Sequence, residues 1–289
     1  MRLRAGIFAL AACCAAGCTL LVDARGLAGG GAPDASPDAR SDDGPSDRPS
    51  VVVATDDASS DAHNLEAPVH PYVQAVLADG PSLYYRFEEA SGSIAKDEMG
   101  NHPGTHRAGD VLAVAGAFPG SSAMGLSGGT QGGVDPGDIF DFDGTAAFTL
   151  EAWFRPDRYD GEYRFLIHHN EESTLRQSYG IYVQTNNGLV FERYVDGDGR
   201  GAAVPLPARS SWHHIVGVYD GAHLQLFLDG TLASSAPDLR SAKKKSSVLQ
   251  IGWGWGDGSG VLRGTLDEVA IYEKALAPER IAAHFEAAR

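Results

Sequence analysis

The chain has 289 residues, 43% of them hydrophobic, and a formal net charge of −15. A protein this acidic, without a basic stripe, is a poor partner for nucleic acid and gains no attraction to an anionic membrane surface. All three cysteines lie at the N-terminus (Cys13, Cys14 and Cys18), so the rest of the chain has neither a disulfide nor a cysteine metal site.

The first residues resemble the signal of a bacterial lipoprotein. Arg2 and Arg4 make a short positive segment, and the apolar residues 5–12 are too few to span a bilayer as a helix. The four residues that end at Cys18 read Ala-Ala-Gly-Cys, with Ala15 where lipoproteins more often have Leu. The resemblance implies that residues 1–17 are a signal peptide and that Cys18 is lipidated. The alternative is an ordinary secretory signal cut after an alanine.

The residue after the cysteine is Thr19, whereas an Asp there retains Gram-negative lipoproteins at the inner membrane. The resemblance therefore implies an outer-membrane location, with the domain in the periplasm or on the cell surface. Several acyl chains anchor a protein durably where one chain does not. We expect contact with the bilayer through Cys18 alone.

Residues 18–70 are rich in Asp, Ser, Pro, Ala and Gly, and from Asp23 to about Val69 the only apolar run is Val51-Val52-Val53. Such a segment buries too little surface to offset the entropy of ordering it. We predict a disordered, negatively charged tether between the anchor and the folded domain.

Residues 71–289 have the pattern of an all-β domain with a short helix near each end. We predict helices at 71–77 and after Pro278, a loop at 95–109, and strands at 83–88, 123–127, 133–136, 148–155, 163–168, 179–185, 189–195, 202–206, 212–219, 224–228, 231–235, 248–252 and 266–272. Asp229-Gly230 is a strong hairpin signal because both central positions of the turn need positive φ. Many short strands separated by turns are typical of a two-sheet sandwich.

Three stretches, in this order, resemble laminin-G-like, or concanavalin A-like lectin/glucanase, jelly-roll domains. They read Phe-Thr-Leu-Glu-Ala-Trp-Phe-Arg-Pro at 148–156, Trp-His-His-Ile-Val-Gly-Val-Tyr-Asp-Gly at 212–221, and Gly-Thr-Leu-Asp-Glu-Val-Ala-Ile-Tyr at 264–272. The resemblance runs from about Tyr72 to the C-terminus. It implies a jelly-roll sandwich of two antiparallel sheets, a fold that hosts lectins, hydrolases and adhesion modules alike.

The catalytic motif of glucanases with this fold, Glu-x-Asp-x-x-Glu, is absent: Glu151, Glu192 and Glu268 lack the required partners. The Gly-x-Ser-x-Gly nucleophile elbow is absent as well. We therefore predict a non-catalytic binding or adhesion module, with a glycan or an envelope or extracellular protein as its partner. The alternatives are a glycoside hydrolase with an unrecognised site and a structural envelope protein without a small ligand.

Two adjacent histidine pairs, His168-His169 and His213-His214, suggest a zinc site at first sight. Neighbouring residues of a strand point to opposite faces, so neither pair chelates one ion. We predict that these histidines are structural.

The resemblance also implies a calcium site. The segment from Asp97 to Gly104 resembles the family's Asp-x-x-Gly-Asn-x-x-Gly loop, and Asp267-Glu268 resembles its C-terminal acidic pair. In related jelly rolls a calcium ion ties this loop to the last strand, and calcium takes about six to eight oxygen ligands. The predicted ligands are Asp97 and Asn101, with Asp267 or Glu268. The alternative is a hydrogen-bonded turn beside an exposed acid pair.

Trp253 and Trp255 lie in a glycine-rich segment at the end of a predicted strand. If the strand continues, the two indoles share a face, and the flanking glycines leave them uncovered. They then form a platform for sugar rings, with Asp257 accepting hydroxyl hydrogen bonds. The alternative is that both tryptophans cap the core.

The lipoprotein signal makes a direct prediction. Replacing Cys18 by alanine removes the acceptor thiol, so we expect Cys18→Ala to leave the membrane fraction and appear in the soluble fraction. Fractionation followed by immunoblotting measures this, with Cys13→Ala as the matched control. A Cys18→Ala protein that stays with the membranes as wild type does would contradict the anchor.

Overall fold

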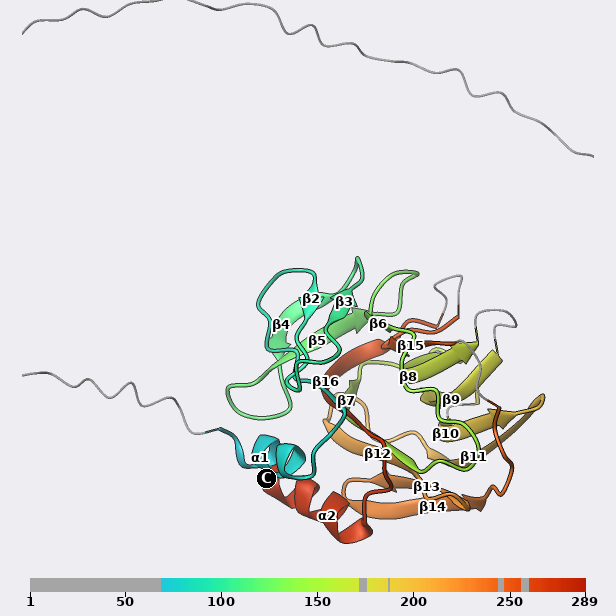
Figure 1. Ribbon diagram of the computed structural model, residues 1–289. Helices are drawn as coiled ribbons and strands as arrows, with labels where there is room; N and C mark the ends of the chain where they lie inside the picture. Colours follow the sequence, from blue (N-terminus) through green and yellow to red (C-terminus); the bar gives the residue numbers. More distant parts are fainter. Residues whose placement is uncertain (1–68, 172–175, 187, 244–246, 256–259) are drawn as a thin grey trace, which may run out of the picture. The chain divides into compact units, whose positions relative to one another are not determined.

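The computed structural model describes residues 69–171, 176–186, 188–243, 247–255 and 260–289 (Figure 1). Cys18 and Asp257 lie outside these ranges. All described residues belong to the second of the two units into which the chain divides, His63–Arg289. They form two antiparallel sheets of eight strands each and two short helices, as the jelly-roll prediction requires.

Sheet A has the order β14 (Thr231–Pro237), β13 (His223–Leu228), β12 (His213–Tyr219), β7 (Phe148–Pro156), β16 (Arg263–Tyr272), β5 (Ser122–Ser127) and β4 (Val111–Ala115), and β1 (Leu83–Tyr85) also pairs with β16. Sheet B has the order β11 (Asp198–Pro205), β10 (Gly188–Val195), β9 (Arg176–Val183), β8 (Arg164–Glu171), β15 (Ser247–Ile251), β6 (Val134–Gly137), β3 (Gly104–His106) and β2 (Ile94–Ala95). The helices are α1 (Pro71–Ala78) and α2 (Pro278–Ala287).

The main core lies between the inner faces of the two sheets. In β7 the alternate residues Phe148, Leu150, Ala152 and Phe154 all belong to this core, as the period-two pattern predicts. Close packing leaves no room for a side chain at Gly217 of β12, where a Cβ would come within 2.6 Å of the Phe191 ring. The ring of Phe191 on sheet B therefore packs directly on the backbone of β12 on sheet A.

The outer face of sheet A is buried as well. Trp153, Val216 and Phe227 form a second apolar cluster there with residues of both helices, including Tyr72 of α1 and Ile281 of α2. Figure 1 shows α1 and α2 beside each other, near the C-terminus of the chain. Within the described ranges, neither helix has the length and apolar composition needed to cross a membrane.

A fully buried carboxylate, Glu151 of β7, holds this outer layer together. It accepts hydrogen bonds from the Tyr72 hydroxyl at 2.8 Å and from the Tyr272 hydroxyl at 3.0 Å. The rings of His214 and His284 contact it at 2.7 and 3.0 Å. A buried carboxylate needs this many partners, because an unpaired one costs several kcal/mol.

His284 joins both helices to the sheet. Its Nδ1 faces Glu151, and its Nε2 lies 2.8 Å from Oδ2 of Asp79, the residue that follows α1. Because both ring nitrogens face carboxylate oxygens, both donate, and the ring is an imidazolium. Burial alone would lower the pKa of His284, but Glu151 and Asp79 raise it above the usual 6.5.

The sequence prediction was wrong at short strands with little apolar signal. The predicted loop 95–109 contains β3 and the end of β2, which pair with each other. Strand β4 was not predicted, because it lies at the edge of sheet A and exposes Val111, Ala113 and Ala115, so it lacks a buried face. In both places, pairing with distant strands decides the conformation.

The Glu151–His284 contact predicts a pH-dependent stability. Burial alone would raise the pKa of Glu151, but His284 and His214 hold it well below 4.5. The stability that the Glu151 carboxylate contributes is therefore present above pH 4.5 and is lost as the pH falls below 4.5. The stability that the His284 imidazolium contributes is complete below pH 6.5 and is lost as the pH rises through the raised pKa of the folded state. The pair stabilises the fold most between pH 4.5 and 6.5.

We expect His284→Ala to lower the free energy of unfolding by about 3 kcal/mol near pH 6, because it breaks a buried ion pair, and by less near pH 9. Urea denaturation at both pH values measures this. His223→Ala is the control, because that side chain is 52% exposed. An equal loss at the two pH values would contradict the assignment.

Candidate functional site

The two tryptophans of the predicted platform point into different clusters. Trp253 is 6% exposed and belongs to the main core, where its Nε1 donates to the Val134 carbonyl at 3.0 Å. The Arg107 guanidinium covers its ring at 3.5 Å. β15 ends at Ile251, and the chain turns at Gly252, whose φ is +77°, so the alternation of a strand does not continue. Trp253 is thus a core residue, as the alternative proposed.

Trp255 lies on the outer face of sheet B and is half-buried. Its ring stands edge-on to Tyr163 at 5.4 Å and to Phe165 at 5.1 Å between centroids. Its φ of +58° is unusual for a non-glycine residue and turns the indole onto this face. Asp257, the predicted hydroxyl acceptor, is outside the described residues.

An aromatic and polar strip continues from Trp255 across the outer face of sheet B. Phe165 of β8, Tyr182 of β9 and Val190 of β10 are cross-strand neighbours. The Tyr182 hydroxyl donates to Glu192 Oε2 at 2.6 Å, and Gln184 lies 3.3 Å from the same hydroxyl. We call Tyr163, Phe165, Tyr182, Gln184, Glu192 and Trp255 the aromatic strip.

The strip ends at the carboxylate of Glu192. This group is only partly buried, and it forms no ion pair with a described side chain on a neighbouring strand of the sheet. Glu192 is half-buried, and burial raises its pKa above the usual 4.5, against the Tyr182 hydrogen bond and the charge of Arg240. Burial and the Glu192 carboxylate together raise the pKa of Tyr182, so its hydroxyl stays protonated. Phe165 and Tyr182 are buried, so the strip offers the half-buried rings of Tyr163 and Trp255 at one end and hydrogen-bonding groups at the other.

Beside the strip, two buried acceptors have no partner. His168 stacks on Phe165 at 4.2 Å, and burial lowers its pKa to about 3, so the ring is neutral. Its Nδ1 donates to Gln250 Oε1 at 2.9 Å, which leaves Nε2 as an acceptor without a hydrogen bond. Asn170 Oδ1 is unsatisfied as well. Buried acceptors of this kind bind ordered water.

The predicted calcium loop is a hydrogen-bonded turn. Asp97 Oδ1 accepts from the backbone amides of Tyr84 at 2.9 Å and Met99 at 3.1 Å. Its Oδ2 accepts from the amides of Asn101 at 3.0 Å and His102 at 2.9 Å. The Asn101 side chain is exposed. Because four amides already satisfy Asp97, the geometry favours the alternative at this loop.

The other two predicted ligands lie on β16, where a bulge interrupts the pairing with β7 after Asp267. Asp267 Oδ2 accepts from the Ala117 amide at 2.8 Å, whereas Oδ1 is buried and has no partner. Burial and the neighbouring Glu268 raise the pKa of Asp267. Glu268 accepts from the Tyr84 hydroxyl and contacts Arg86, and burial raises its pKa to about 7.

The four predicted ligands do not form one shell. Across the described part of the chain, no three His, Cys, Asp or Glu side chains converge as a metal centre. A calcium ion at Asp267 would therefore need backbone carbonyls in addition to carboxylates, and calcium accepts both.

Two hollows in the described part of the chain lie apart from the strip. A groove of about 770 Å³ beside α1 has polar groups that mainly bond one another: Arg86 with Glu88, and Gln74 with the Val69 carbonyl. A hollow lined by His169 and Tyr179 measures only about 30 Å³, room for roughly one or two waters. Neither combines space with free polar groups as a ligand site requires.

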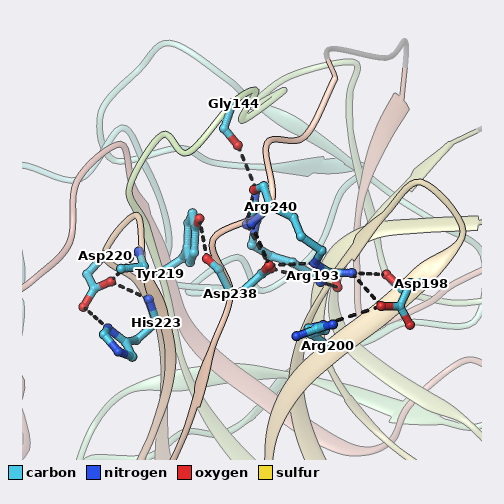
Figure 2. Close-up of polar contacts among 10 residues, drawn as sticks. Gly144, Arg193, Asp198, Arg200, Tyr219, Asp220, His223, Asp238 and Arg240 are labelled. Atoms are coloured by element: carbon cyan, nitrogen blue, oxygen red, sulfur yellow. Dashed lines mark hydrogen bonds and ion pairs between the residues drawn. The ribbon is translucent and has the colours of Figure 1, made fainter.

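Figure 2 shows the polar cluster around Arg193. Arg193 also lines the smaller hollow. Arg193 bonds Asp238 at 3.0 Å and the Gly144 carbonyl at 3.0 Å, and it lies over the Tyr219 ring at 3.8 Å. Arg240 bonds the other oxygen of Asp238 at 2.7 Å. The two arginines are thus occupied in fixing a loop to sheets A and B, and the cluster is structural.

The predicted histidine roles agree with the geometry. His168 contacts Gln250 on the outer face of sheet B, whereas His169 stacks on the core residue Tyr179. His213 bonds Asp229, and His214 bonds the buried Glu151. Each ring has its own partners, so the adjacent pairs serve packing.

The sequence analysis missed Tyr163, Tyr182 and Glu192 as candidate site residues. The period-two pattern of two predicted strands does contain this information. It places Tyr182 and Gln184 on one face of the strand 179–185, and Val190 and Glu192 on one face of the strand 189–195. The alternation alone does not tell which face a second sheet covers.

The comparisons with known proteins agree with the fold. The family model of the Concanavalin A-like lectin/glucanases superfamily matches residues 128–282, more than half of the chain. The chain therefore belongs to this superfamily. A search of curated proteins gives no match.

Among solved structures, Trypanosoma rangeli sialidase in complex with sialic acid is similar at 17% identity and a TM-score of 0.55, over 70% of this chain and 32% of the sialidase. The binding domain of Paraclostridial Mosquitocidal Protein 1 has 17% identity and a TM-score of 0.57, over 72% and 52%. Domain 4 of AbnA, a GH43 extracellular arabinanase from Geobacillus stearothermophilus in complex with arabinotriose, has 16% identity and a TM-score of 0.51, over 72% and 98%.

These similarities establish the fold. The chain spans about a third of the length of the sialidase, but nearly all of the arabinanase domain. The superfamily and its structural neighbours include both enzymes and binding domains.

Proposed function

We propose that this chain is a non-catalytic carbohydrate-binding module and that the aromatic strip is its sugar contact. The observation that carries the proposal is Trp255, a half-buried indole on the outer face of sheet B, continuous with Tyr182 and the carboxylate of Glu192. Sugar rings have an apolar face that packs on aromatic rings and hydroxyls that need placed acceptors. The strip supplies both.

The structural neighbours support this class of ligand. The arabinanase domain was solved with arabinotriose, and it corresponds to this chain over 98% of its own length. At 16% identity this similarity does not identify a ligand for the chain, so the proposal rests on the residues of the strip.

The strip lacks the geometry that glycoside hydrolysis needs. Retaining glycosidases use two carboxyl groups about 5 Å apart, and inverting ones use a pair about 6.5–9.5 Å apart. Among the described residues of the strip, Glu192 alone has a carboxylate, and its Oε2 is engaged by Tyr182. Binding without hydrolysis is therefore the function that the geometry supports best.

The proposal includes the location given by the sequence. Lipid on Cys18 would hold the protein at the outer membrane, and residues 18–70 would separate the module from the bilayer. A module so placed meets glycans of the envelope or of the surroundings.

We also propose one calcium ion at Asp267. The supporting observation is its Oδ1, which is buried and has no partner. Three carboxylates interact electrostatically here, those of Glu88, Asp267 and Glu268. Among the described residues, the Arg86 guanidinium is the positive group beside them. An ion held by Asp267 and nearby backbone carbonyls would balance this charge and fix β16.

Trp255→Ala tests the sugar contact. We expect the full-length protein, screened on an array of neutral and acidic glycans, to bind a defined set. Trp255→Ala should weaken that binding at least tenfold, about 1.4 kcal/mol, because it removes the half-buried indole that we propose contacts the sugar. Thermal denaturation should show a folded variant.

Trp253→Ala is the matched control, because it should lower the melting temperature while any folded fraction keeps its affinity. Absence of binding to every glycan would favour the structural alternative. Release of reducing ends from a bound glycan would favour the hydrolase.

Calcium binding is tested through stability. A ligand that binds only the folded state raises the free energy of unfolding by about 2.7 kcal/mol at 100 times its Kd. We expect calcium to raise the melting temperature of the wild type and of Asp97→Asn, but not of Asp267→Asn. A wild-type melting temperature equal in calcium and in chelator would contradict the site.

A further inference from the structure

The charges along the aromatic strip discriminate between classes of sugar. Its described polar groups are the Tyr163 and Tyr182 hydroxyls, the Trp255 indole N–H, the Gln184 amide and the Glu192 carboxylate, none of them cationic. The buried groups beside it, His168 Nε2 and Asn170 Oδ1, are acceptors. The hydroxyls of a neutral sugar can donate to the half-buried Glu192 carboxylate, whereas His168 and Asn170, 0% and 2% exposed, are closed to a sugar.

The neighbouring arginines are already paired. Arg164 at the edge of β8 binds Asp160 at 2.5 Å. Arg240 binds Asp238 at 2.7 Å and also Asp198. A guanidinium or ammonium group is the strongest partner for a sugar carboxylate, and these two guanidinium groups are engaged.

The backbone beside Glu192 keeps its carboxylate accessible. Strand β11 has Gly199 and Gly201 next to it, and a Cβ on Gly199 would lie 2.1 Å from Glu192 Oε1. A larger residue there would displace the carboxylate. Oε2 is held by Tyr182, so the charge is fixed in place and does not swing away from a ligand.

We infer that the aromatic strip accepts neutral sugars and rejects those that carry a carboxylate, such as sialic and uronic acids, and that Glu192 is the residue that determines this selectivity. The inference rests on the proposed function. It sets this chain apart from any expectation drawn from the sialidase, which was solved with sialic acid. A ligand carboxylate near Glu192 meets a like charge, with no described cation on the strip to offset it.

The test compares matched glycans that differ by a carboxylate: lactose against sialyllactose, and galactotriose against trigalacturonate. All are immobilised densely on an array. The neutral and acidic glycans that bind best in the first screen are included as well. Wild type should prefer the neutral members. Glu192→Gln should improve binding of the acidic members by about fivefold, the effect of one like charge at contact distance in water. The measured quantity is the ratio of acidic to neutral binding, since Glu192→Gln keeps an oxygen that accepts from Tyr182 but removes the negative charge.

Glu286→Gln is the control for net charge, because Glu286 is 67% exposed on α2 and far from β10 in the fold. Raised salt should reduce the discrimination in wild type and not in Glu192→Gln. Equal wild-type binding of neutral and acidic members, or discrimination that survives in Glu192→Gln, would overturn the inference while the proposed function stands. Failure to bind any glycan, or binding that Trp255→Ala leaves intact, would instead overturn the proposed function itself.

Discussion

Sheet A is covered on both faces, and this constraint leaves sheet B as the sheet whose outer face the described helices do not cover. Its inner face packs on sheet B, and its outer face is buried under α1, α2 and Phe118. Both described helices therefore lie on the same side of the sandwich (Figure 1). The outer face of sheet B is the other large surface of the fold, and the aromatic strip lies there.

Glu151 explains why the covering of sheet A is so specific. An apolar layer alone would tolerate small shifts of the helices, whereas a buried carboxylate must keep its donors within hydrogen-bond distance. Tyr72 and His284, one from each helix, fix both helices against β7. The arrangement also links the helices to each other through Asp79. Sheet A thus serves as a rigid support for the sheet that carries the candidate site.

The fold could be predicted from the sequence to a greater extent than the site. Alternation in residues such as Phe148 to Phe154 depends only on local geometry, so the strands and their inward faces were predictable. The two tryptophans failed to share a face because Gly252 and Trp255 adopt positive φ, which no spacing rule reveals. The bond between Glu151 and His284 joins residues 133 positions apart, and nothing local marks either as a partner of the other.

The proposed calcium site and the proposed sugar contact lie on different sheets. Asp267 is on β16 of sheet A, whereas Glu192 is on β10 of sheet B. A bound ion alters the affinity of a distant site only if it favours one of two conformations that differ at that site. The densely packed core between the sheets, with the ring of Phe191 against Gly217, leaves little space for such an alternative arrangement. In the proposed function, calcium would therefore act only as a stabiliser of β16, and sugar recognition would depend on the outer face of sheet B alone.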